Sequence, residues 1–177
     1  MTTIALTGMM GCGKSSVSEE LSRRTGWPYI DLDQRIEQEA GCSIPEIFAA
    51  ESEAGFRKRE ARALAAILEQ DREETGFRIL SLGGGTLDAP GCLELVRDHT
   101  YCIYLKASVP TLTARLEHAD AARRPMLSGA DLAGRLSELL SRRGERYEKA
   151  ARLTIDTDGK NLGEVIEEIL KETKGRV

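Results

Sequence analysis

The stretch Gly8-Met9-Met10-Gly11-Cys12-Gly13-Lys14-Ser15 follows an apolar run at residues 3–6 and leads into a segment, 15–24, with apolar residues at helical spacing. Glycines in such a loop let the backbone take positive φ and bring consecutive N–H groups close to an anion. The lysine supplies positive charge for β- and γ-phosphates, and the serine hydroxyl can ligate magnesium. The order of strand, glycine-rich loop and helix predicts a phosphate-binding loop, completed by the helix N-terminus, rather than an ordinary turn beside an unrelated lysine.

Length and composition limit the classes of protein that this chain can belong to. Its 177 residues suit one domain, and 25 basic against 29 acidic residues give a formal charge of −4. The overall charge therefore does not favour binding to nucleic acid or to an anionic membrane, and an anionic ligand would need a local cluster of positive charge. No apolar run approaches the roughly 20 residues of a membrane span, and the four cysteines lack metal-site spacing. We expect a cytoplasmic protein with reduced thiols.

A second strand is predicted at residues 29–33, and it ends in Asp31 and Asp33. A strand, a helix and a strand form a right-handed unit that places both strand ends at one edge of a parallel sheet. Because residues two apart on an extended segment point to the same face, both carboxylates could reach the phosphate loop. Alternatively, they cap a helix that starts at Gln34. Their position beside a triphosphate site favours a role with magnesium or a substrate hydroxyl.

The remaining strands are predicted at 77–82, 100–105 and 152–157, and helices at about 52–71, 93–98, 108–118, 132–150 and after Asn161. The third strand runs into Gly83-Gly84-Gly85, whose backbone can approach a ligand closely. The charges at 57–62 fit mostly a solvated helix face, with Arg57 kept as a candidate. The segment around Arg124 could be a lid that brings an arginine over the γ-phosphate, although surface arginines are common.

Taken over essentially the whole chain, the pattern resembles the shikimate kinase family. The phosphate loop alone implies only a nucleotide, so the resemblance rests on further motifs that are far apart in the chain. These are Asp31-Leu32-Asp33, Phe56-Arg57 with Glu60, Gly83-Gly84-Gly85, Arg124-Pro125, and Arg143 with Tyr147. The chain departs from the family at Ser52, where relatives often carry glycine.

The resemblance implies a P-loop, nucleoside-monophosphate-kinase-like α/β fold of three layers, with a central five-stranded parallel sheet flanked by helices. It implies one kinase domain over residues 1–177, with a substrate-binding helical region at about 33–62 and a lid at about 119–129. The implied reaction is transfer of phosphate from ATP to the 3-hydroxyl of shikimate, which gives shikimate 3-phosphate and ADP for chorismate biosynthesis. Shikimate and ATP would be the partners of a monomer that binds neither nucleic acid nor membrane.

The same resemblance implies roles for individual residues. The catalytic residues would be Lys14, Asp33 and Arg124. ATP would be bound by Gly11, Cys12, Gly13, Lys14, Ser15, Ser16, Arg124 and Lys160. Shikimate would be held by Asp33, Arg57, Gly83, Gly84, Gly85 and Arg143. Magnesium would lie at Ser15 and Asp31, and Arg115 is a candidate for the other face of the adenine.

Two other functions are compatible with the phosphate loop. A gluconate kinase would share the loop but gives no reason for two substrate arginines, Asp33 and three glycines to occur together. A regulatory or scaffold protein that binds nucleotide without turnover could lose Lys14, Asp33 or Arg124, and this chain has all three.

Overall fold

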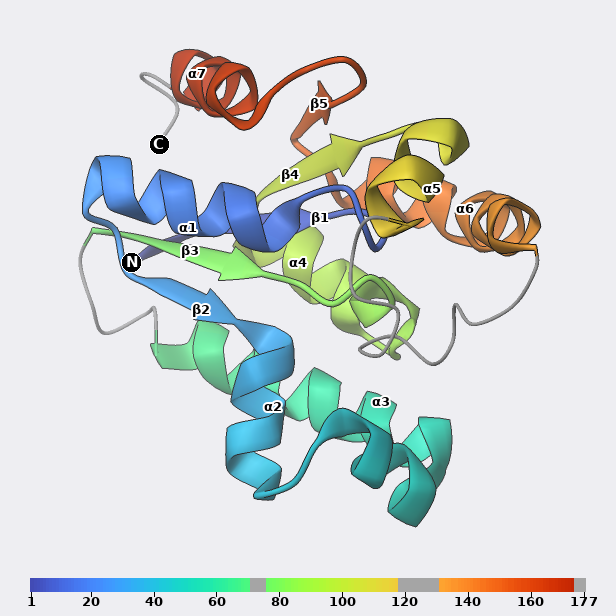
Figure 1. Ribbon diagram of the computed structural model, residues 1–177. Helices are drawn as coiled ribbons and strands as arrows, with labels where there is room; N and C mark the ends of the chain where they lie inside the picture. Colours follow the sequence, from blue (N-terminus) through green and yellow to red (C-terminus); the bar gives the residue numbers. More distant parts are fainter. Residues whose placement is uncertain (71–75, 118–130, 174–177) are drawn as a thin grey trace.

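The computed structural model describes residues 1–70, 76–117 and 131–173. Within these ranges a parallel sheet has the strand order β2-β3-β1-β4-β5 (Figure 1), which confirms the five-stranded parallel sheet expected from the sequence. The strands are β1 (Thr2–Thr7), β2 (Tyr29–Asp31), β3 (Phe77–Ser81), β4 (Tyr101–Lys106) and β5 (Leu153–Asp156). Because β1 is central, the loop that follows it lies in the middle of the carboxyl edge.

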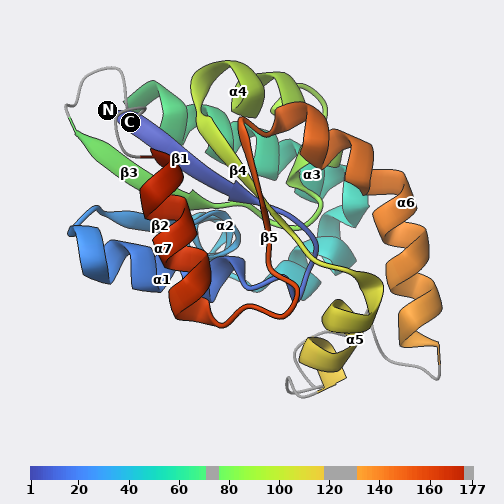
Figure 2. The same ribbon diagram turned by 90° about the horizontal axis from the view of Figure 1, so that it is seen from above.

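Helices cover both faces of this sheet (Figure 2). On one face lie α1 (Lys14–Thr25) and α7 (Leu162–Thr173), and on the other lie α4 (Cys92–His99), α6 (Leu132–Ala150) and part of α3 (Ile44–Gln70). The short α2 (Leu32–Ala40) packs on α3 and projects with it beyond the sheet (Figure 1). The connections η1 (Thr86–Asp88) and α5 (Val109–Glu117) follow the carboxyl ends of β3 and β4.

The burial of β1 agrees with its central position in the sheet. Its residues Ile4, Ala5 and Leu6 are all fully buried, as expected for a parallel strand with helices on both faces. On α1, Val17 and Leu21 face the sheet and are buried. None of the helices in the described ranges combines the length and apolar character that a membrane crossing needs.

The helix α3 is kinked at Ser52, where φ is 65° and ψ is 175°. This combination is essentially confined to glycine, so a serine there is strained. The kink divides α3 into two helical segments, 44–51 and 53–70, and the second agrees with the helix predicted from about Ser52. An ion pair of 2.6 Å between Glu51 and Arg59 joins the two segments across the kink.

The predicted extension of the second strand through Asp33 is wrong. The strand β2 ends at Asp31, whose side chain accepts a hydrogen bond of 3.1 Å from the backbone N–H of Gln34 and so caps α2. Asp31 therefore lies at the N-cap of α2 and Asp33 in its first turn. The two side chains lie in the same region, but they are not neighbours on one face of a strand.

Candidate functional site

The phosphate loop connects β1 to α1 in a conformation that its glycines require. Gly8 has a φ of 139°, and a Cβ atom there would lie 2.6 Å from the carbonyl oxygen of Leu105. Gly13 has a φ of 100° and is the N-cap of α1, so the first N–H groups of that helix face the loop. The Lys14 ammonium donates hydrogen bonds to the carbonyl oxygens of Gly8, at 2.7 Å, and Met9, at 3.1 Å. The loop thus holds its lysine over its own backbone.

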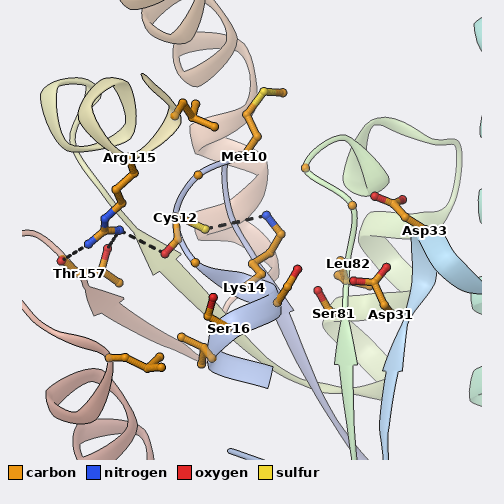
Figure 3. A pocket seen from close by; sticks show the side chains of 18 of the residues that line it. Met10, Cys12, Lys14, Ser16, Asp31, Asp33, Ser81, Leu82, Arg115 and Thr157 are labelled. Carbon is orange, nitrogen blue, oxygen red and sulfur yellow. Dashed lines mark hydrogen bonds between the residues drawn. The ribbon is translucent and has the colours of Figure 1, made fainter. Parts of the chain in front are cut away.

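A cavity of about 1030 Å³ opens at this loop. Its wall includes all the residues of the described ranges that the sequence assigned to ATP, namely Gly11, Cys12, Gly13, Lys14, Ser15, Ser16 and Lys160. Asp31 and Asp33 lie on one side of the loop, and Arg115 and Thr157 lie on the other (Figure 3). The geometry places a binding region for anionic groups between a pair of carboxylates and an arginine.

Arg115 joins the phosphate loop to the segment after β5. Its guanidinium donates to the carbonyl oxygen of Cys12 at 3.3 Å, and to the hydroxyl and carbonyl oxygens of Thr157 at 3.0 and 2.8 Å. Lys160 also lines this end of the cavity, and its ammonium pairs with Glu168. Cys12 is buried beside these contacts, so its thiol is shielded from solvent.

Asp33 is a partly buried carboxylate whose surroundings raise its pKa. Burial raises the pKa of Asp33 from its usual 3.8 to about 6. The nearby negative charges of Asp31 and Glu60 act in the same direction, whereas the positive charge of Lys14 opposes them. Asp33 also lies against the third strand's glycines, since a Cβ atom on Gly83 would be 2.8 Å from its Oδ1.

Glu60 is buried, so its assignment to a solvated helix face is wrong. Its side chain is 1% exposed, and it accepts hydrogen bonds of 2.6 Å from the Arg57 guanidinium and from the Thr86 hydroxyl. A charged group at this depth needs such partners. The helical spacing could have predicted this burial, because Glu60 lies one helical turn from both Phe56 and Leu64, which are buried.

Two guanidinium groups converge above Gly85. A Cβ atom on this residue would lie 2.5 Å from Nη2 of Arg57 and 3.0 Å from Nη2 of Arg143. The structure therefore brings together two arginines that are far apart in the chain. Neither arginine belongs to the cavity wall itself, but Gly83 and Gly84 do, and they continue directly into Gly85.

Counter-charges lie behind both arginines. Arg57 pairs with Glu60 and, at 3.2 Å, with Glu53, while the Nε of Arg143 donates to Asp88 at 2.8 Å. At an effective dielectric constant of about 20, two unit charges 4 Å apart interact by about 4 kcal/mol, so these carboxylates offset the mutual repulsion of the guanidinium groups. Sequence reasoning missed Asp88, which carries no motif spacing of its own.

The residues expected at a magnesium ion are Ser15 and Asp31, and both line the cavity. One oxygen of Asp31 caps α2, and the other accepts a hydrogen bond of 3.2 Å from the Tyr29 hydroxyl. Over the described ranges no group of three or more histidine, cysteine, aspartate or glutamate side chains could hold a metal ion. The donors present therefore fit a cation that keeps several waters and takes phosphate oxygens, which is the usual state of magnesium with nucleotides.

The predicted lid residue Arg124 lies outside the described residues. Within the described residues the site thus consists of a phosphate loop, a carboxylate whose pKa is raised to about 6, and two arginines above a glycine turn. A family model described as "Shikimate kinase" matches residues 10–174. The chain belongs to the shikimate kinase family.

Individual relatives agree with this assignment along almost their whole length. The chain is 41% identical to the shikimate kinase of Chlorobaculum tepidum over 98% of this chain and 91% of the relative. It is 38% identical to that of Symbiobacterium thermophilum over 98% and 97% of the two chains. A solved shikimate kinase from Acinetobacter baumannii, in complex with shikimate, matches with a TM-score of 0.87 and 28% identity over 99% of this chain and 94% of that one.

Proposed function

We propose that this chain transfers the γ-phosphoryl group of ATP to the 3-hydroxyl of shikimate, giving shikimate 3-phosphate and ADP. The observation that supports this most directly is the convergence of Arg57 and Arg143 above Gly85, next to a cavity that contains the phosphate loop. Two guanidinium groups at one point suit a carboxylate, which each can bind through paired N–H donors. Shikimate has one carboxylate and three ring hydroxyls, which suit this cluster and the neighbouring Asp33.

Asp33 is proposed to orient the acceptor hydroxyl and to accept its proton. With a pKa of about 6, its carboxylate is mostly ionised at neutral pH yet holds a proton more readily than an ordinary aspartate. Its place against Gly83 puts it between the phosphate loop and the arginine cluster. The helical region at about 33–62, which carries Asp33 and Arg57, is on this proposal the part that binds the acceptor.

The phosphate loop and Ser15 are proposed to bind the magnesium complex of ATP. A bound magnesium ion neutralises charge on the β- and γ-phosphates. The chain's own part is to fix these groups: the N–H groups of the loop and of α1 bind phosphate oxygens, and Lys14 leaves its loop carbonyls to pair with them. Asp31 stays bonded to the α2 backbone and is proposed to contact the ion through water.

Arg115 and Lys160 are proposed to border the adenine, since both line the far end of the cavity from Asp33. Arg124, in the proposed lid at about 119–129, is proposed to add positive charge at the phosphates during transfer and to help exclude water. Arginines with this role contribute about 10³-fold or more to kcat, so an Arg124→Ala variant would be nearly inactive with both substrates still bound.

ADP release measured side by side with shikimate, gluconate, a nucleoside monophosphate and no acceptor tests the proposal. We expect turnover that depends on magnesium and shikimate. Arg57→Ala should raise the KM for shikimate by about 100-fold, the effect of losing a hydrogen-bonded charge pair, and leave the KM for ATP within about twofold. The matched control is Arg62→Ala, an exposed arginine of the same helix. Release of ADP that is indifferent to shikimate would refute the proposal.

The chain is further proposed to act as a cytoplasmic monomer without nucleic-acid or membrane partners. Its formal charge of −4 supports the lack of polyanionic partners. Within the described ranges Leu162 is the one large apolar side chain that is exposed, which offers little surface for a stable dimer. Light scattering after gel filtration should give a mass near 19.4 kDa.

A further inference from the structure

The turn that follows the three glycines is held by side chains of α6. The Tyr147 hydroxyl donates to the carbonyl oxygen of Gly84, and Nη1 of Arg146 donates to the carbonyl oxygen of Leu87 at 3.0 Å. Tyr147 is 1% exposed, so its bond lies in the core beneath the site. These contacts fix the turn and α6 relative to each other at both ends of the turn.

Asp88 ends this turn and faces the same helix. Its backbone N–H donates to the carbonyl oxygen of Gly85 at 2.9 Å, so its position is coupled to the glycine beneath the arginine cluster. Its Oδ2 accepts the bond of 2.8 Å from Nε of Arg143, and its Oδ1 lies 3.8 Å from Nε of Arg146. The carboxylate is therefore held from the backbone side and from two side chains.

The effect of the Asp88–Arg143 ion pair depends on which guanidinium nitrogen of Arg143 it occupies. A guanidinium can present its Nε side or its terminal nitrogens, and Asp88 occupies the Nε. Among the described residues no hydrogen-bond partner is found for Nη1 or Nη2 of Arg143. Its Nη2 points to the same place above Gly85 as Nη2 of Arg57. The ion pair between Asp88 and Arg143 thus leaves the terminal nitrogens of Arg143 available above Gly85, where Arg57 also presents its Nη2.

We propose that Asp88 is a positioning residue for Arg143, which holds that guanidinium by its Nε so that its terminal nitrogens meet the carboxylate of the acceptor. The inference rests on the proposed function, because it takes the ligand of the arginine cluster to be a carboxylate. A long side chain loses rotamer freedom when it binds, and an arginine fixed in advance loses less. Asp88 also balances one of the two positive charges while the acceptor is absent.

The opposite role for Asp88 would be that of an internal competitor, which occupies Arg143 and must be displaced by the acceptor. The two roles predict opposite changes. If Asp88 positions Arg143, its removal weakens acceptor binding; if it competes, its removal strengthens binding. The direction of the change in the KM for shikimate therefore separates them.

The experiment compares wild type with Asp88→Ala, Asp88→Asn and a matched control, Asp98→Asn. Asp98 is a good control because it also bonds the Nε of an arginine, Arg97, at 2.8 Å, but lies exposed at the end of α4. The KM for shikimate, the KM for ATP and kcat are measured for each, with circular dichroism and thermal unfolding to verify folding. The same series is run with the methyl ester of shikimate, which lacks the negative charge.

We expect Asp88→Ala to raise the KM for shikimate about tenfold, the scale of one charge-assisted hydrogen bond, with the KM for ATP unchanged. Asp88→Asn should have a smaller effect, because the amide oxygen can still accept from Nε. Asp98→Asn should match wild type. With the methyl ester, the ratio of the KM values of variant and wild type should fall close to one, which a purely structural role would not produce.

Several results would overturn the inference. An unchanged KM for shikimate in Asp88→Ala would show that Arg143 needs no support, and a lower KM would identify Asp88 as a competitor. Equal losses for shikimate and its ester, or a parallel rise in the KM for ATP, would show a general structural role. These outcomes are distinct from failure of the proposed function, in which wild type itself releases no ADP in response to shikimate.

Discussion

Replacing Asp33 by asparagine should make the protein more stable at pH 8 and abolish its activity. The side chain makes no hydrogen bond within the described part of the chain, so asparagine, which has nearly the same shape, loses no partner there. What it removes is the cost of a charge that burial and the neighbouring carboxylates of Asp31 and Glu60 disfavour.

The magnitude follows from the pKa of Asp33, which rises from 3.8 to about 6 on folding. One pKa unit corresponds to about 1.4 kcal/mol, so the ionised carboxylate costs at most about 3 kcal/mol. Because the side chain reaches an open cavity, water screens part of this cost, and we expect about 1 to 3 kcal/mol. For a chain of this size that is a rise of roughly 2 to 12 °C in Tm.

The sign of the pH dependence is fixed by the same values. Below about pH 4 the carboxyl group is protonated in the folded and unfolded states, and the variant gains nothing. Between about pH 4 and 6 the folded state binds the extra proton, so wild-type stability falls as the pH rises. Above pH 6 the full cost is present, and so is the full advantage of asparagine.

Urea unfolding of wild type and Asp33→Asn at pH 4, 5, 6 and 8, without nucleotide or magnesium, tests this prediction, with Glu94→Gln, an exposed residue of α4, as the control. The difference in the free energy of unfolding should grow from near zero to its plateau across this range, while ADP release by the variant is lost. A variant that is less stable than wild type at pH 8, or whose advantage does not change with pH, would refute the reasoning.

Three further substitutions test the site and the kink. Glu60→Gln should lower the free energy of unfolding by about 3 kcal/mol in urea titrations and raise the KM for shikimate, because it leaves Arg57 partly unpaired in a buried place. Unchanged stability would show that Glu60 and Arg57 do not form a buried ion pair. Gly85→Ala should raise the KM for shikimate at least about tenfold, because its Cβ displaces Arg57 and Arg143 while its φ of −112° suits alanine. A normal KM would place the arginines elsewhere. Ser52→Gly should raise the free energy of unfolding by about 1 kcal/mol in the same titrations, since glycine relieves the strain at a φ of 65°. A loss of stability would show that the backbone at Ser52 is not strained.

Much of the fold could be read from the sequence because the signals are local. The phosphate loop carries its glycines, Lys14 and Ser15 within eight residues, so its pattern can be recognised without knowledge of the rest of the chain. The helix 132–150 was predicted with the bounds that the structure gives, from leucines at helical spacing and Tyr147. The last helix was predicted to follow Asn161, and in the structure the side chain of Asn161 accepts a hydrogen bond of 3.1 Å from the N–H of Glu164 in its first turn.

The residue at which the second strand ends could not be predicted from the local sequence. Asp31 and Asp33 are compatible with a strand or with a helix start, and the choice depends on whether a backbone N–H two or three residues on is available to a carboxylate. In the structure Asp31 takes the N–H of Gln34, so the helix begins one residue later. The strand also loses its partner there, because the pairing of β2 with β3 ends at Asp31 opposite Ser81, which lies far away along the chain.

The sequence by itself predicted the phosphate loop, and the family resemblance supplied the residues that are proposed to face the acceptor. Tertiary structure alone decided how Arg143 is supported, because Asp88 holds it by its Nε. The physical reason is distance along the chain. The pattern of the loop lies within consecutive residues, whereas an ion pair between residues 55 positions apart exists only once the sheet and α6 have brought the two side chains together.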